Sequence, residues 1–181
     1  IRYSYDARLR AVRMDARPGD VEVQGTDHRD AVFATAGNNV IRAGAGDDLI
    51  YAGAGSNATD RAVTFTRAAQ AAGADAIMSV VPYYNKPMPH GMAAHFRAVA
   101  AATTLPIILH DVPSRTVKGL TDETLLELAA SPRFAGLRDG SADIARLARL
   151  RSRLPARFRM LTGADIRSEE NTSELQSHEH L

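Results

Sequence analysis

Short apolar runs alternate with longer amphipathic segments through the middle of the chain. The apolar runs are bounded by turn residues and have the length of strands that are buried on both faces, as in a parallel sheet. The longer segments carry apolar residues at helical spacing. The predicted strands cover residues 76–81, 106–109, 134–137 and 158–161, and the predicted helices cover 60–73, 91–103, 122–130 and 142–153. This alternation predicts an α/β fold that forms part of a barrel.

Polar residues mark the points where two of these helices begin. Thr59 or Asp60 can cap the first helix, and Thr121 can cap the third, because their side-chain oxygens can accept hydrogen bonds from free backbone N–H groups. The last helix carries several arginines beside an apolar stripe. We expect those arginines to lie on a solvated face.

Three of the predicted strands end in residues that suit a functional site. The residues that follow them are Pro82-Tyr-Tyr-Asn-Lys-Pro87, then His110, Asp111, Ser114 and Arg115, and then Arg138-Asp139-Gly140. In parallel α/β folds, ligands bind and catalytic groups collect at the carboxyl ends of the strands. We therefore place the candidate site at this edge of the predicted sheet.

Residues 25–51 repeat with a period of nine. Each of three blocks has Asp or Asn at its sixth place and an aliphatic residue at its eighth; these are Asp30, Asn39 and Asp48, and Val32, Ile41 and Ile50. The blocks resemble the calcium-binding nonapeptide repeat of RTX proteins, in which glycines permit tight turns and aspartates bind calcium. The resemblance implies a short β-roll of secreted origin, with Asp48 as a candidate calcium ligand. A series of Gly/Ala/Asp-rich turns that leads into a strand is the alternative.

Length and composition narrow the possibilities. The chain has 181 residues, fewer than the roughly 250 of a complete barrel of this kind, so we expect a partial barrel. The formal net charge is +1, and the basic residues are spread along the chain, which argues against a nucleic-acid partner. The absence of cysteine excludes disulfides and thiolate metal sites, and no run approaches the roughly 18 apolar residues of a membrane span. The chain begins at Ile1 without a signal-like segment, and we interpret it as a fragment.

Four stretches resemble, in order and spacing, the family of dihydrodipicolinate synthase and N-acetylneuraminate lyase. They are Ala52-Gly-Ala-Gly-Ser-Asn-Ala-Thr59, Pro82-Tyr-Tyr-Asn-Lys-Pro87, Val112-Pro-Ser-Arg-Thr116 and Gly136-Leu-Arg-Asp139. The resemblance covers about residues 52–165 and is strongest to the dihydrodipicolinate synthase branch. It implies that residues 52–166 form about the third to seventh strands of a (β/α)8 TIM barrel.

The same resemblance implies the chemistry of a pyruvate-dependent class I aldolase, a lyase of lysine biosynthesis that needs no cofactor. A lysine amine forms a Schiff base with pyruvate, and the derived enamine attacks an aldehyde, aspartate semialdehyde in this branch. By resemblance, Arg115 holds a substrate carboxylate, and Tyr84 joins a proton relay across a dimer interface. Tyr83 and Asn57 match positions of the family's regulatory lysine site.

Two positions depart from the family pattern. His110 stands where the family has its proton-relay tyrosine, and Arg138 stands where it has the Schiff-base lysine. A guanidinium stays protonated in proteins and cannot supply a free amine. The two lysines, Lys86 and Lys118, both follow predicted strands. We therefore expect the chain to lack aldolase activity unless one of them replaces the missing nucleophile.

Two other hypotheses remain open. One is a calcium-binding repeat module of a secreted protein with an enzyme fragment fused to it. The other is a barrel-like protein that binds keto acids through Arg115 alone. For the parent enzyme, the resemblance implies a cytoplasmic homo-oligomer that acts on small keto-acid and aldehyde substrates.

The two ends of the chain and the start of the family-like part carry weaker indications. Residues 1–24 are unassigned and are compatible with a strand pair or a disordered arm. Residues 52–57 fit both the nine-residue repeat and the family's third-strand turn, which suggests a junction between two sequences and hence a chimera. The tail 167–181 resembles a translated sequencing-library adapter, and we expect it to be disordered.

Overall fold

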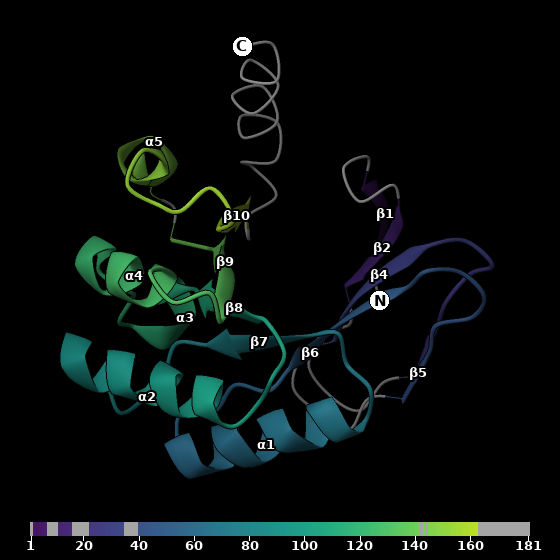
Figure 1. The fold of residues 1–181 in the computed structure, drawn as a ribbon, viewed down its shortest axis with the longest axis horizontal. Coiled ribbons are helices and arrows are strands. Elements are labelled where there is room, and N and C mark those ends of the chain that lie inside the picture. Colours follow the sequence, from purple (N-terminus) through teal and green to yellow (C-terminus); the bar gives the residue numbers. More distant parts are fainter. Residues whose placement is uncertain are drawn as a thin grey trace.

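The computed structural model describes residues 2–6, 11–15, 22–34, 40–141, 143 and 145–162. An eight-stranded sheet of order β1-β2-β4-β6-β7-β8-β9-β10 runs through the molecule (Figure 1). Its strands are β1 Arg2–Asp6, β2 Ala11–Asp15, β4 Asp30–Ala34, β6 Leu49–Gly53, β7 Ala76–Val80, β8 Ile107–Asp111, β9 Phe134–Asp139 and β10 Arg159–Thr162. β1 and β2 are antiparallel, and every other pair in this sheet is parallel.

Helices follow the strands from β6 onward. They are α1 Thr59–Ala71, α2 Pro89–Ala101, the single turn α3 Pro113–Thr116, α4 Asp122–Ala129 and α5 Arg146–Arg151. Figure 1 shows α1, α2, α4 and α5 succeeding one another along the outside of the curled strands β6 to β10. The predicted α/β fold and partial barrel are thus confirmed. No helix in the described part of the chain is long and apolar enough to cross a membrane.

The main core lies between the strands and these helices. Ile77, Leu109 and Leu137 of three neighbouring strands are fully buried, and they face Phe96 of α2 and Leu125 of α4. Leu109 is directly opposite Leu137 in the register of β8 and β9. Burying such a side chain contributes about 1.5–3 kcal/mol. These residues identify the face of each strand that packs against the helices. The residues next to them along each strand therefore face the inside of the curl.

The two predicted helix caps have different outcomes. The Thr121 side chain accepts a hydrogen bond from the Thr124 N–H, so the cap of α4 is confirmed. The cap predicted for α1 is wrong, because Ala58 occupies the N-cap position and makes no side-chain hydrogen bond. The Thr59 hydroxyl instead pairs with His95 Nδ1 of α2 at 2.9 Å.

The predicted solvated face of the last helix is only partly right. Arg149 and Arg151 are exposed, whereas Arg146 has 3% exposure and is buried as deeply as the core. The helix is also shorter than the predicted 142–153, since α5 begins at Arg146 and ends at Arg151.

The nine-residue period has a structural counterpart. β2 pairs with β4, and β4 with β6, each at an offset of 18 positions; the short parallel sheet of β3 (Glu22–Gln24) and β5 (Val40–Arg42) has the same offset. Each coil therefore holds two repeats of nine. The aliphatic residues at this spacing stack inside the coil as Met14, Val23, Val32 and Ile41. The period thus extends upstream of residue 25, and β1 and β2 form the strand pair that was one expectation for residues 1–24. We call the described residues between 11 and 53 the roll.

The strand β6 belongs to both parts of the molecule. It pairs with β4 of the roll through Ile50 and Val32, and with β7 of the half-barrel through Ala52 and Ile77. The sheet is therefore continuous across the junction suggested at residues 52–57. Asn39 of the second repeat and the adapter-like tail 167–181 lie outside the described residues.

Candidate functional site

His110 and Arg138 lie side by side where β8 and β9 end. They are directly opposite in the parallel register, and Arg138 Nη1 is 2.9 Å from His110 Nε2. The guanidinium can only donate, so Nε2 accepts and the imidazole proton sits on Nδ1. Both residues lie at the carboxyl ends of their strands, the edge where the sequence places the candidate site.

The electrostatic surroundings keep His110 neutral. The pKa of His110 is lowered to about 4, first by burial and then by the positive charges of Arg138 and Arg115. At neutral pH the imidazole is therefore an acceptor and not an acid. It cannot act as a general acid in the way that a protonated histidine would.

Arg115 reaches this edge from the loop after β8. It lies in α3, which begins at Pro113, a residue that suits the first helical position because it has no N–H to satisfy. The Thr116 hydroxyl donates to the carbonyls of Val112 and Lys118 and ties the loop together. Arg115 itself is exposed, so its guanidinium is accessible to an anion from solvent.

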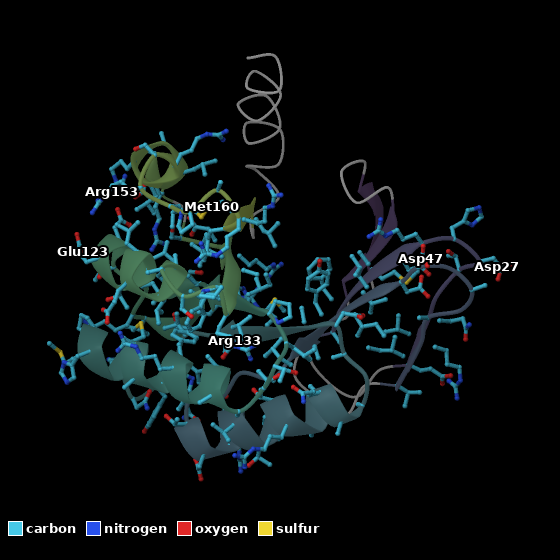
Figure 2. All side chains as sticks on the ribbon, in the orientation of Figure 1. Asp27, Asp47, Glu123, Arg133, Arg153 and Met160 are labelled. Carbon is cyan, nitrogen blue, oxygen red and sulfur yellow. The ribbon has the colours of Figure 1, made fainter. Side chains whose placement is uncertain are left out.

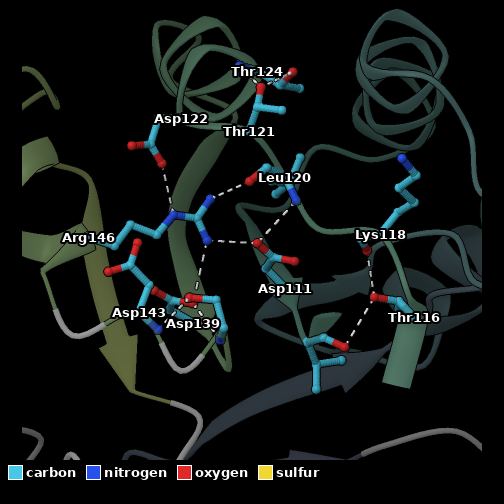
Figure 3. A network of polar contacts seen from close by, with 12 residues as sticks. Asp111, Thr116, Lys118, Leu120, Thr121, Asp122, Thr124, Asp139, Asp143 and Arg146 are labelled. Atoms are coloured by element: carbon cyan, nitrogen blue, oxygen red, sulfur yellow. Dashed lines mark hydrogen bonds and ion pairs between the residues drawn. The ribbon is translucent and has the colours of Figure 1, made fainter. Parts of the chain in front are cut away.

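A second set of charges surrounds Arg146 of α5 (Figure 3). Arg146 Nη1 is 2.8 Å from Asp111 Oδ2 and 3.5 Å from Asp139 Oδ1, and Arg146 Nε is 3.0 Å from Asp122 Oδ1. Burial raises the pKa of Asp111, although the hydrogen bond from Arg146 opposes that rise. No local pattern around Arg146 indicates its role, because its acidic partners come from other elements.

Tyr83, Tyr84 and Asn57 form a separate group. Tyr84 is 87% exposed and has φ +70°, a left-handed conformation that a bulky side chain rarely adopts, and Tyr83 is also exposed. Asn85 donates from Nδ2 to the Asn57 carbonyl at 3.0 Å. This bond joins the loop after β7 to the loop after β6, so the three predicted residues occupy one region.

Neither lysine has the surroundings of a Schiff-base nucleophile. Lys86 and Lys118 are both exposed, in the loops after β7 and α3. A lysine that forms a Schiff base is commonly activated by desolvation or by a neighbouring cation in a pocket. Their positions therefore support the expectation that no lysine replaces Arg138.

Asp48 holds a turn of the roll together. Its Oδ1 accepts the N–H of Asp30 at 2.9 Å, and the buried Asp30 carboxylate in turn accepts the N–H of Thr26 at 2.6 Å. Gly44 and Gly46 have φ +95° and +129°, and a side chain at Gly44 would collide with the Thr26 carbonyl. These glycines are needed for the close stacking of turns 25–29 and 43–47.

A metal site made of side chains alone is not found in the described part of the chain. No group of three His, Cys, Asp or Glu residues there could hold an ion. Asp27 and Asp47 lie on the side of the roll that is farthest from the helices (Figure 2). The Asp48 carboxylate accepts the backbone N–H of Asp30. Calcium would therefore have to use backbone carbonyls in addition to Asp48.

Comparison with known proteins decides the family. The sequence profile of the Dihydrodipicolinate synthetase family (DHDPS) matches residues 1–173. The chain belongs to this family. The match extends beyond residues 52–165, where the sequence motifs placed the resemblance.

Curated relatives and solved structures agree with the family assignment. The chain is 47% identical over 110 residues to the 4-hydroxy-tetrahydrodipicolinate synthase of Laribacter hongkongensis, a match that covers 61% of this chain and 38% of that protein. It resembles the dihydrodipicolinate synthase of Aquifex aeolicus with a TM-score of 0.65 and 35% identity, over 67% of this chain and 42% of the other. The DHDPS of Cyanidioschyzon merolae, solved with lysine bound, has a TM-score of 0.67 and 38% identity, over 70% and 43% of the two chains. The chain thus spans well under half the length of these family members.

Proposed function

We propose that the chain binds a small 2-oxo acid of the pyruvate class at the edge formed by His110, Arg115 and Arg138, and that it does not carry out aldol condensation there. The observation that carries this proposal is the Arg138–His110 contact at the ends of β9 and β8. The relatives are named 4-hydroxy-tetrahydrodipicolinate synthase, which supports the parent enzyme that the resemblance implies, one that condenses pyruvate with aspartate semialdehyde. In this chain a guanidinium stands at the position of the nucleophile.

The step that we propose this chain cannot carry out is Schiff-base formation. Schiff-base formation needs a neutral amine that attacks the ketone carbon and expels its oxygen as water, leaving a carbon–nitrogen double bond. Arg138 keeps its proton and cannot attack. Binding needs less: the Arg115 fork can pair with a carboxylate through two parallel hydrogen bonds, and Arg138 supplies a fixed positive charge nearby.

Borohydride trapping tests the chemical half of the proposal. The protein is incubated with pyruvate and borohydride, and its intact mass is measured. We expect no added mass for the unaltered chain and the mass of one reduced pyruvyl group for Arg138→Lys. An adduct on the unaltered chain that disappears in Lys86→Arg or Lys118→Arg would show that a lysine has taken over, and the proposal of inactivity would be wrong.

Thermal shift tests the binding half. Pyruvate should raise the melting temperature of the unaltered chain, and Arg115→Gln should abolish the rise. Arg153→Gln is the matched control, since Arg153 is exposed on the segment after α5 (Figure 2) and should leave the rise intact. An equal rise in Arg115→Gln would remove Arg115 from the site.

Calcium binding by the roll is a second candidate function, favoured by the offset of 18 positions between its stacked strands. In such a coil, carbonyls and carboxylates of stacked turns can surround a hard cation. The test is a calcium titration followed by circular dichroism, with Asp48→Ala as the comparison. A gain in β signal that Asp48→Ala abolishes supports the function, and a flat titration through millimolar calcium opposes it.

A second copy of the chain is the partner we propose for Tyr84. The support is its large exposure at a strained backbone position, together with its match to a tyrosine at a family dimer interface. Sedimentation velocity should show association that Tyr84→Asp weakens and Phe65→Ser, a change at an exposed aromatic of α1, does not. A monomer at all concentrations would contradict this.

Lysine is the ligand we propose for the neighbouring regulatory residues Asn57 and Tyr83. The support is the bond between Asn85 and Asn57, which brings the two loops together, and the similarity to a structure solved with lysine bound. Isothermal titration with lysine should give heat that Asn57→Ala reduces. Equal heats for the unaltered chain and Asn57→Ala would mean that lysine does not bind at Asn57.

A further inference from the structure

Arg146 is bound on three sides inside the protein. Its Nη2 donates to the Leu120 carbonyl at 2.6 Å, its Nη1 to Asp111 and its Nε to Asp122. Asp111 is fully buried and its Oδ2 also accepts the Leu120 N–H at 3.1 Å. The arrangement uses the full planar fork of a guanidinium, which a lysine ammonium cannot reproduce.

The partners of Arg146 are the neighbours of the site residues along both strands. Asp111 follows His110 in β8, and Asp139 follows Arg138 in β9. In the register of the two strands, His110 is opposite Arg138 and Asp111 is opposite Asp139. Successive side chains of a strand point to opposite faces of the sheet. Leu109 and Leu137 pack against the helices, so Asp111 and Asp139 lie on that side, while His110 and Arg138 lie on the inner side.

We propose that Arg146 is a positioning residue that fixes the ends of β8 and β9 to each other from the helix side, and thereby keeps His110 and Arg138 in contact on the inner side. One guanidinium reaches a carboxylate on each strand, at 2.8 Å for Asp111 and 3.5 Å for Asp139. Because both carboxylates sit next to a site residue, any change in the spacing of the strand ends changes the His110–Arg138 distance.

This role concerns the site of the proposed function, but its test does not depend on that function. The histidine responds to two nearby cations, Arg138 on β9 and Arg115 on α3, and to its burial. If the strand ends separate, Arg138 moves away and water enters. Both changes favour the protonated imidazole, so His110 itself reports the spacing of the strands.

The experiment is an NMR titration of the His110 ring in the full chain without any keto acid, with the signal assigned by its loss in His110→Gln. The unaltered chain should titrate at a pKa of about 4. In Arg146→Lys the pKa should rise towards 6.5. Arg149→Lys is the matched control, because Arg149 lies one turn away on α5 and pairs with Asp122 and Asp143 at the surface, and its His110 pKa should not change.

A folded Arg146→Lys with an unchanged His110 pKa would overturn the proposal and leave Arg146 a purely structural residue. If Arg146→Lys does not fold, Asp122→Asn takes its place, since it removes the negative charge of one partner at the partly exposed end of the fork. It should raise the His110 pKa by a smaller amount, and no rise would again overturn the proposal. Pyruvate binding is measured separately, so a protein in which His110 responds to Arg146 but pyruvate does not bind refutes the function and leaves the positioning role standing.

Discussion

Arg138 donates a hydrogen bond to His110 across the ends of two parallel strands, with 2.9 Å between Nη1 and Nε2. The family chemistry expected from the sequence calls for an amine and a tyrosine hydroxyl at these two places. Here a permanent cation faces a neutral ring. The pair holds charge in place but has no free amine to form a covalent bond with a ketone.

Arg138→Met should raise the pKa of His110 from about 4, because it removes the positive charge that lowers this pKa more than Arg115 does. The rise should stop short of 6.5, since burial, the principal cause of the shift, remains. Arg115→Met is the comparison and should give a smaller rise. Ring NMR of the two variants measures both values, and a larger effect of Arg115→Met would reverse our ranking of the two charges.

Stability should fall as the pH drops from about 6.5 to about 4. Burial lowers the pKa of His95, and burial with two arginines lowers that of His110 to about 4. Within this window the unfolded chain binds protons that the folded chain excludes, so the free energy of unfolding decreases; above 6.5 the stability is fully present. Asp111 acts in the opposite direction. Because its pKa is raised in the folded chain, the folded chain binds a proton at a higher pH than the unfolded chain does, and this stabilises the folded chain as the pH falls.

The two histidines should outweigh Asp111. For His110 alone we expect a loss of about 1–2 kcal/mol after allowing for its partial exposure. Urea unfolding at several pH values measures the loss. His110→Gln should reduce the loss of stability, whereas His90→Gln, a change at an exposed residue of α2, should not. A flat profile for the unaltered chain would contradict the assignment of His110 as neutral.

Thr121→Ala should destabilise the protein by about 1 kcal/mol, because the Thr124 N–H at the start of α4 loses its acceptor. Thr59→Ala removes no cap, as Ala58 occupies that position in α1. Its effect should come instead from the lost contact with His95. Amide hydrogen exchange separates the two cases: faster exchange at the start of α4 in Thr121→Ala, and no change at the start of α1 in Thr59→Ala. Faster exchange in both would show that Thr59 acts as a cap after all.

Tyr84→Gly should stabilise the isolated chain by about 1 kcal/mol, because glycine adopts φ +70° without the steric cost that tyrosine has there. Tyr83 has no positive φ, so Tyr83→Gly should destabilise the chain through the added freedom of the unfolded state. Urea unfolding at a protein concentration below any association provides the measurement. Equal effects of the two substitutions would mean that the backbone at Tyr84 is unstrained.

The sequence predicted the features that depend on residues close together in the chain. The strands, the order of the helices and the Thr121 cap depend on periodicity and on residues a few positions apart. The contact of Thr59 with His95 joins residues 36 positions apart, and Arg146 meets Asp122 and Asp111 at separations of 24 and 35. The sequence alone does not show such partners, so Arg146 was expected at the surface.

The roll illustrates the same limit. Its later repeats carry glycines and aspartates that mark the turns, and those residues made the period visible. Met14 and Val23 continue the period only through their buried spacing of nine. An aliphatic residue every ninth position has no distinctive local chemistry, so the early coils were unassigned until their stacking was known.

The shared strand β6 also bears on aggregation. A parallel half-barrel that began at β6 would present a row of unpaired backbone N–H and carbonyl groups, which is a template for the strands of other chains. β4 occupies that edge through the register of Ala31 to Ala34 with Leu49 to Ala52, and the edge of the sheet moves outward to β1. Whatever the origin of the roll, it shields β6 from other chains.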